Sequence, residues 1–233
     1  MESKLFIVGT PIGNLDDITL RAMKTLNEVD IILCENCRNS QKLLNHYKIF
    51  DKKLISYHNF NEHEISPKII SYLKENKNIA LITDAGMPCI SDPGFEIIRL
   101  AKLENISIEV IGGPTAFTHA LIKANQSNKF TFLGFLKDRS IARQNELKKL
   151  SYGTYVTYVS PHKLISTLED LKIIFNDDIN LYLIKEMTKI HETSYEGKPS
   201  DILKILPKQI KGEFTLVFTI SLKKKEKINK YKN

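Results

Sequence analysis

The first 124 residues alternate between short apolar segments and segments with a helical spacing of apolar side chains. This alternation restricts the possible fold more than any other feature of the chain. The apolar segments are 4–8, 30–35, 54–58, 79–83 and 108–111. The segments with helical spacing are 18–27, 40–47, 64–76, 95–104 and 116–124. Strands that are nearly continuously apolar are typical of sheets buried on both faces, so we predict an α/β fold with a parallel sheet between helices.

The pattern changes after residue 125, where strand-like segments become frequent. They are 129–136, 154–159, 180–186, 192–196 and 212–222, with helical segments at 141–150 and 162–175. The short spacings leave room for antiparallel pairing. We therefore predict a boundary near Gly113-Pro114. It separates a parallel α/β domain (1–113), a mixed α/β domain (114–222) and a lysine-rich tail (223–233).

The composition is that of a globular protein with a sizeable core, since 42% of the 233 residues are hydrophobic. No apolar run approaches the roughly 20 residues that a membrane span needs. The apolar stretch near the N-terminus is too short for a signal peptide. We expect a cytoplasmic protein that has no membrane association.

Three cysteines, an odd number, argue against a disulfide framework. Cys34 and Cys37 form a C-x-x-C where a strand meets a helix, which is a common position for a redox pair. Cys34 also ends an apolar segment, and this favours a buried structural thiol. No second cysteine pair completes a zinc site, and the spacing of His58 and His63 matches no standard metal site, so no metal is predicted.

The net charge of +7 is concentrated at the C-terminus, where residues 223–233 contain six lysines and one glutamate. Such a tail attracts polyphosphates, or it simply keeps the chain in solution. The helical segment 141–150 and the residues before it are also basic. Their cations contact RNA phosphates in one interpretation and form a solvated face in the other: Arg139, Arg143, Lys148 and Lys149.

Three unusual loops follow strands of the first domain, at Gly9–Asn14, Asp84–Pro88 and Gly112–Ala116. In open α/β sheets, ligands bind beyond the carboxyl ends of the strands. Glycine allows a ligand to approach the backbone, and proline holds a loop in place. Neither a G-x-G-x-x-G nor a P-loop motif is present, which disfavours a phosphate chain. S-adenosylmethionine (SAM) fits better, because carboxylates and carbonyl oxygens suit its cationic sulfur.

A series of motifs in these and later segments resembles one family. The motifs are GTPIGNLDDITLRA, ENCR, DAGMPCISDPG, GGPTAFTHAL, GFL, YVSPHKL, KEMTK and GEFTLV, in this order between residues 4 and 220. They resemble the ribosomal RNA small subunit methyltransferase I family of the tetrapyrrole-methylase superfamily. The resemblance implies two α/β domains with SAM in the cleft between them, and a homodimer. It also implies 2′-O-methylation of a cytidine ribose in 16S rRNA, with small-subunit rRNA or the 30S subunit as partner.

The resemblance also implies a set of cofactor-binding residues, each at a position that matches a family motif. They are Thr10, Pro11, Asp84, Gly86, Met87, Ile90, Thr115, Ala116, Tyr158, Gly212 and Phe214. Arg38 and Lys189 match basic positions that would face RNA.

Methyl transfer to a ribose hydroxyl needs a base, or a cation that stabilises the developing alkoxide. We expect Glu35, Arg38, Glu186 and Lys189 to form a polar wall opposite the sulfonium. Glu186 or Glu35 would be the base, or Lys189 the stabilising group. The alternative is that these charges only order loops through ion pairs.

Two other functions remain open. A methyltransferase of tetrapyrrole or corrinoid precursors would share the fold, although such enzymes favour a first loop of the G-x-G-P-G-D type. A SAM-binding but catalytically weak RNA-binding or assembly protein is the second. It is motivated by Asn36 and Val159, which stand where the family usually has carboxylates.

Overall fold

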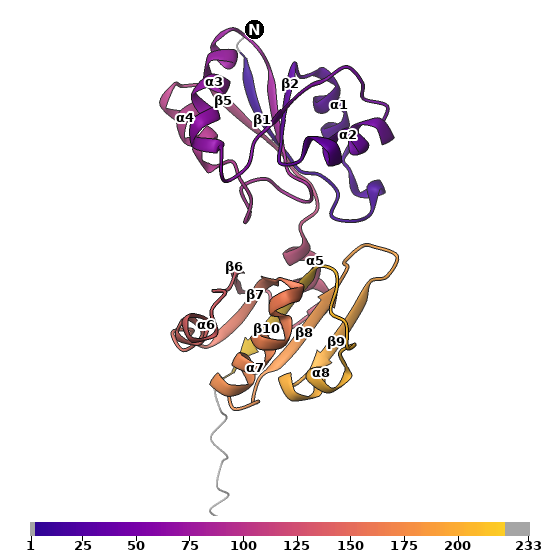
Figure 1. Ribbon diagram of the computed structural model, residues 1–233, viewed down its shortest axis with the longest axis vertical. Coiled ribbons are helices and arrows are strands. Elements are labelled where there is room, and N and C mark those ends of the chain that lie inside the picture. Colours follow the sequence, from indigo (N-terminus) through magenta and orange to yellow (C-terminus); the bar gives the residue numbers. More distant parts are fainter. Residues whose placement is uncertain (1–2, 222–233) are drawn as a thin grey trace, which may run out of the picture. The chain divides into compact units, whose positions relative to one another are not determined.

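The computed structural model describes residues 3–221, which form two compact units (Figure 1). The first unit comprises the residues up to His119 together with Met187–His191. The second comprises Ala120–Glu186 and the residues from Glu192 onward. The division therefore falls a few residues after the predicted boundary at Gly113-Pro114. The sequence analysis did not predict that Met187–His191 would belong to the first unit. The lysine-rich tail, 223–233, lies outside the described residues.

The first unit contains a five-stranded parallel sheet in the order β3-β2-β4-β1-β5, which confirms the predicted parallel α/β class. The strands are β1 (Lys4–Val8), β2 (Ile31–Cys34), β3 (Lys53–Ser56), β4 (Ile79–Ile82) and β5 (Ser107–Ile111). Leu5 of β1 lies opposite Ile79 on one side and Ile108 on the other. This register brings the carboxyl ends of β1, β4 and β5 to the same edge.

Helices cover both faces of this sheet, as Figure 1 shows. They are α1 (Leu20–Glu28), α2 (Cys37–His46), α3 (Glu62–Lys74) and α4 (Phe95–Leu103), with a short 3₁₀ turn, η1 (Leu15–Asp17). Helix α5 (Ala116–Ala124) contains the boundary between the two units, which falls between His119 and Ala120. Leu5, Leu33 and Leu81 pack with α3 and α4, while Val8 and Ile32 pack with α1 and α2. All five side chains are fully buried, and each contributes about 1.5–3 kcal/mol relative to an exposed position.

The second unit contains a mixed five-stranded sheet in the order β6-β7-β10-β8-β9. The strands are β6 (Phe130–Phe135), β7 (Gly153–Val159), β8 (Asn180–Lys185), β9 (Thr193–Gly197) and β10 (Phe214–Ile220). Only the β6–β7 pair is parallel within this described sheet; the other pairs are antiparallel. The mixed class predicted from the short spacings is confirmed.

The helices of the second unit are α6 (Ser140–Leu147), α7 (Leu164–Ile174) and α8 (Pro199–Ile205), with a 3₁₀ turn, η2 (Pro161–Lys163), before α7. Leu168 and Leu171 of α7 pack with Leu181, Leu216 and Phe218 of the sheet in one core. Helix α8 was missed by the sequence analysis. Pro199 at its first turn was the available signal, because proline is well suited to that position.

Helix α2 begins at Cys37, three residues before the predicted start at 40, because Asn36 caps it. The Asn36 Oδ1 atom accepts the backbone N–H groups of Arg38 at 3.1 Å and Asn39 at 3.4 Å. Asparagine and aspartate are about equally effective at this position. The amide at Asn36 therefore keeps the capping role that a carboxylate would have.

No helix among residues 3–221 is long and apolar enough to cross a membrane.

Candidate active site

The three loops singled out in the sequence pack against one another at the carboxyl edge of the first sheet. Thr10 and Gly86 pair as an isolated antiparallel bridge, with N···O distances of 2.9 and 3.1 Å. The Thr10 hydroxyl donates to the Thr83 carbonyl at 3.1 Å. A Cβ atom added to Gly9 would lie 2.7 Å from the Gly113 Cα atom. The close packing of these loops therefore depends on glycine.

Thr10 and Pro11 are buried, and the Thr10 hydroxyl bonds within its own unit. Thr10 thus joins two loops. The family resemblance implied only a cofactor contact for this residue. Asp84 and Ile90 are exposed at the same edge. Gly86 has a φ of +80°, a conformation that glycine adopts readily.

The loop between β4 and α4 doubles back on itself. Cys89 and Ser91 have φ values of +68° and +67°, in the left-handed region that non-glycine residues rarely adopt. Gly94 has a φ of +135°, and an added Cβ would lie 2.5 Å from the Cys89 Sγ atom. The Gly94 N–H donates to Glu62 Oε2 at 3.2 Å. The loop is held by neighbouring groups in a conformation that its sequence alone would disfavour.

Three carboxylates influence one another in this region. Burial, followed by the charges of Glu35 and Asp84, raises the pKa of Asp92 to about 7. Burial, followed by the Asp84 charge, also raises the pKa of Glu35. Asp84 Oδ2 accepts a hydrogen bond from Asn39 Nδ2 at 2.9 Å. Crowded, partly buried carboxylates stabilise a cation placed among them, so these residues fit the sulfonium of SAM.

Cys34 and Cys37 stand on either side of Glu35 and Asn36. Their Sγ atoms are 3.3 Å apart, and both thiols are free. Cys34 is fully buried, as the prediction of a structural thiol requires. Burial, followed by the hydrogen bond with Cys37, raises the pKa of Cys34 to about 12. Arg38, in the first turn of α2, is exposed.

The Met187–His191 segment places Lys189 in the first unit. Thr188 Oγ1 accepts the Asn14 N–H at 3.1 Å. A Cβ added to Gly13 would lie 2.5 Å from Lys189 Cγ. The stem of Lys189 therefore packs on the first loop, and Lys189 belongs to the same unit as Glu35 and Arg38.

Glu186 belongs to the second unit, where it binds a turn. Its Oε1 atom accepts the Glu213 N–H at 2.8 Å, and its own N–H donates to the Glu213 carbonyl at 2.9 Å. A Cβ added to Gly212 would lie 2.7 Å from that same Oε1 atom. The carboxylate thus orders the Gly212–Glu213 turn. This favours the loop-ordering interpretation over a base at Glu186 and leaves Glu35 as the candidate base.

Two predicted cofactor residues of the second unit differ in accessibility. Tyr158 makes edge-to-face contacts with Phe132 and Phe135, with ring centroids 5.1 and 5.6 Å apart. Phe214 is only 4% exposed and packs in the core with Leu216 and Phe218. The Phe214 side chain is therefore part of the core, and a cofactor contact at this position stays a prediction for its backbone. Its backbone follows the Gly212–Glu213 turn.

Arg143 was predicted on an RNA-facing surface of the basic helix, and this prediction is wrong. Its side chain is buried and forms an ion pair with Asp170, with an Nε···Oδ2 distance of 2.7 Å. Its other donors bond to Ser166 Oγ and to the carbonyls of Lys137 and Asp138. Three cations of the predicted set are exposed as expected: Arg139, Lys148 and Lys149.

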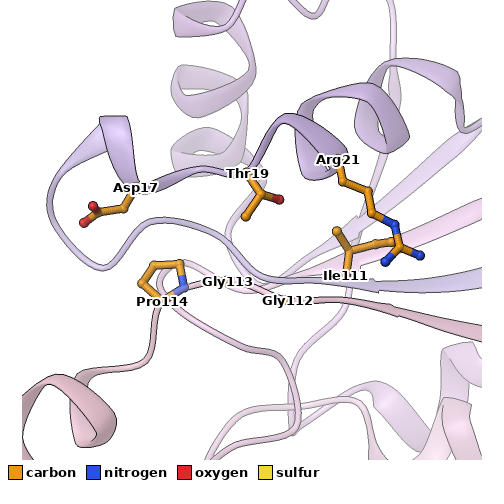
Figure 2. Close-up of a pocket in the computed structure, with 7 residues that line it drawn as sticks. All are labelled: Asp17, Thr19, Arg21, Ile111, Gly112, Gly113 and Pro114. Carbon is orange, nitrogen blue, oxygen red and sulfur yellow. The ribbon is translucent and has the colours of Figure 1, made fainter. Parts of the chain in front are cut away.

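A hollow of about 500 Å³ lies beside the end of β5 (Figure 2). Asp17, Thr19 and Arg21 line one side, and residues 111–114 line the other. Thr19 caps α1, because its hydroxyl oxygen accepts the Ala22 N–H at 3.1 Å. The sequence analysis quoted these residues in GTPIGNLDDITLRA but assigned them no site.

A five-stranded parallel sheet with bridged loops at its carboxyl edge, followed by a mixed-sheet unit, defines the class. The family model described as Tetrapyrrole (Corrin/Porphyrin) Methylases matches residues 4–203. The solved uroporphyrin-III-C-methyltransferase from Thermus thermophilus has the same fold, with a TM-score of 0.66 and 18% identity. That comparison covers 92% of this chain and 94% of the solved chain.

The chain belongs to the ribosomal RNA small subunit methyltransferase I family within this class. The relative of that name from Mycoplasmopsis pulmonis is 52% identical, over 94% of this chain and 98% of the relative. The relative of the same name from Mesomycoplasma conjunctivae is 45% identical, over 99% of this chain and 97% of the relative. Membership makes the chain a methyltransferase.

Proposed function

We propose that the chain uses SAM to methylate the 2′-hydroxyl of a cytidine in small-subunit rRNA. The observation that carries this proposal is 52% identity over nearly the full length to a relative named ribosomal RNA small subunit methyltransferase I. The crowded carboxylates at the sheet edge support the choice of cofactor, because SAM carries a positive charge next to its transferred methyl group.

SAM would be held in the first unit by the Asp84–Ile90 loop and by Thr115 and Ala116. In the second unit, the Gly212–Glu213 turn and Tyr158 would contribute. When bound, SAM supplies an electrophilic methyl group with a good leaving group. The protein supplies alignment of the acceptor, exclusion of water and management of one proton.

The ribose 2′-hydroxyl is a weak acid, so its reaction needs a proton acceptor. Glu35 fits this role, because burial and the Asp84 charge raise its pKa and so strengthen it as a base. Arg38 and Lys189 supply positive charge in the same unit. They would stabilise the developing alkoxide or hold a neighbouring phosphate.

The substrate would be free small-subunit rRNA or the 30S subunit, and the working form a homodimer. The exposed cations Arg139, Lys148 and Lys149 would contact the RNA backbone. The lysine-rich tail would add to this attraction. A catalytically weak assembly protein is the second candidate, since carboxylates usual in the family are absent at Asn36 and Val159. The Asn36 cap weakens that argument at one of the two positions.

The test is methyl transfer from labelled SAM to 30S subunits isolated from cells that lack this modification. Free rRNA and a corrinoid precursor serve as controls. We expect label in one cytidine ribose. Label in the precursor would support the corrinoid alternative, and SAM binding without transfer would support the assembly protein.

A matched pair of ligands tests the cofactor site. S-adenosylhomocysteine lacks the positive charge of SAM but keeps the rest of its shape. Calorimetry should show proton release on binding SAM near pH 7, because a cation lowers the pKa of Asp92 from about 7. S-adenosylhomocysteine should release less. Equal release by both ligands would place the sulfonium away from these carboxylates.

A further inference from the structure

The hollow beside β5 has the size and lining of a small-ligand site. Its volume of about 500 Å³ lies within the roughly 300–1,000 Å³ of ligand pockets. The half-buried ring of Pro114 gives it an apolar wall, with the buried Ile111 behind the hollow. The backbone of Gly112 and Gly113 forms its floor. An added Cβ on Gly112 would meet nothing within 4 Å, so that residue faces open space.

The two charged residues of the hollow lie at opposite ends of it, with Thr19 between them (Figure 2). Asp17 Oδ2 is buried and has no hydrogen-bond partner among residues 3–221. An unsatisfied buried acceptor costs about 1–3 kcal/mol. At the other end, Arg21 forms an ion pair with Glu109, and 60% of its side chain is exposed. A guanidinium has five N–H donors, so one such pair leaves it able to bind an anion.

A ligand that matches this lining donates hydrogen bonds at one end, accepts them at the other and is flat and apolar between. A nucleotide has this pattern. Its base amino group can donate to a carboxylate, its phosphate can accept from arginine, and its base can stack on an apolar wall. The methionine part of SAM does not match, because its amino and carboxylate groups share one carbon and cannot reach both ends.

We propose that this hollow is a subsite for one nucleotide of the RNA substrate, next to the nucleotide that is methylated. The proposal rests on the proposed function. Its location supports it: Gly112–Pro114 leads directly into Thr115 and Ala116 of the proposed cofactor loops. Gly113 also packs against Gly9, with an added Cβ at 2.8 Å from Gly9 Cα. A nucleotide in the hollow therefore lies at the same sheet edge as the methyl donor.

The first test fills the hollow with Gly112→Leu. This change is compatible with folding, because the Cβ position is open and the backbone of Gly112 is outside the left-handed region. We expect the affinity for a decoding-region RNA hairpin, measured by fluorescence anisotropy, to fall about tenfold. SAM affinity measured by calorimetry should stay within twofold of wild type.

The second test removes the charges at the two ends. Arg21→Gln is compared with Lys24→Gln, which removes an exposed charge from the same helix outside the hollow. Arg21→Gln should lower RNA affinity and reduce the salt slope by about one, and Lys24→Gln should do neither. Asp17→Asn should weaken RNA binding while leaving the melting temperature unchanged or higher, because it removes a buried charge without a partner.

The outcomes separate this proposal from the proposed function. Methyl transfer by the wild type together with unchanged RNA affinity in Gly112→Leu would overturn the subsite alone. Equal losses in Arg21→Gln and Lys24→Gln would also overturn it. RNA binding without methyl transfer would overturn the proposed function, and the variants would still decide the subsite by binding. A wild-type protein without RNA affinity would overturn both.

Discussion

The ion pair between Arg143 and Asp170 provides a quantitative test of the structure. Arg143 Nε and Nη2 lie 2.7 and 2.6 Å from Asp170 Oδ2, and both side chains are almost completely buried. Asp170 Oδ1 also accepts from Ser140 Oγ and Gln144 Nε2, each at 2.7 Å. This network joins α6 to α7. Removing one partner of a buried ion pair leaves an uncompensated charge and costs about 3–5 kcal/mol.

We therefore expect Arg143→Ala to lower the free energy of unfolding by about 3–5 kcal/mol, a large part of the roughly 5–15 kcal/mol typical of a domain. Urea denaturation followed by circular dichroism measures the change. Lys149→Ala is the matched control, since Lys149 is an exposed cation shortly after the same helix. It should change stability by no more than about 0.5 kcal/mol and should weaken RNA binding.

A neutral double variant, Arg143→Met with Asp170→Leu, should recover part of the lost stability, because neither charge then remains buried without its partner. The reasoning is refuted if Arg143→Ala costs less than 1 kcal/mol and lowers RNA affinity as much as Lys149→Ala does. That result would return Arg143 to the RNA-facing surface that its sequence position first indicated.

Three further predictions concern the first unit. Folding raises the pKa of Asp92 to about 7, so its contribution to stability is complete below about pH 4 and is lost as pH rises to 7. Asp92→Asn should remove this pH dependence and stabilise the protein at pH 8 by about 1–2 kcal/mol, allowing for partial exposure. Urea titrations at pH 4 and pH 8 would measure the free energy of unfolding, and a lower value for the variant at pH 8 would contradict this. In native protein at pH 8, a thiol reagent should modify Cys37 before Cys34, because burial raises the pKa of Cys34 to about 12, and mass spectrometry should reveal the order; faster reaction of Cys34 would be inconsistent with its burial. Gly113→Ala should weaken SAM binding at least tenfold and destabilise the unit by about 1–3 kcal/mol, since the new Cβ would lie 2.8 Å from the Gly9 backbone; calorimetry and melting curves equal to wild type would show that the loops can separate freely.

The class of each sheet could be predicted because it depends on local composition. A strand buried on both faces has to be apolar throughout. The segments at β2 and β4 have this property, and β1 has it after Lys4. Helix boundaries were less accurate, because capping depends on one side chain, as at Asn36. Helix α8 was too short to show a clear periodicity.

The errors at the candidate site have a different origin, since they concern partners distant in sequence. A basic helix indicates a solvated face, and nothing near Arg143 reveals Asp170, 27 residues away. The turn that Glu186 binds follows it by 26 or 27 positions, so its local sequence did not distinguish a base from a loop-ordering carboxylate. The return of Met187–His191 to the first unit is also a tertiary property.

Several departures from ordinary local structure lie at one edge of the first sheet. Cys89 and Ser91 adopt left-handed conformations there, glycines approach within distances that no Cβ could occupy, and burial opposes the ionisation of Glu35 and Asp92. Each feature costs stability, and such costs persist where the surrounding fold imposes them.

A core that needed only to be stable would replace these carboxylates with apolar residues. A site that must receive a cation benefits from keeping them, because the bound charge relieves their mutual repulsion. The same reasoning applies to the proposed subsite: Asp17 Oδ2 has no hydrogen-bond partner within the described part of the chain, and a donor bound in the neighbouring hollow would supply one. The two unfavourable arrangements call for different ligands: a cation at Asp92 and a hydrogen-bond donor at Asp17. A methyl donor and an RNA strand meeting at one sheet edge would satisfy both.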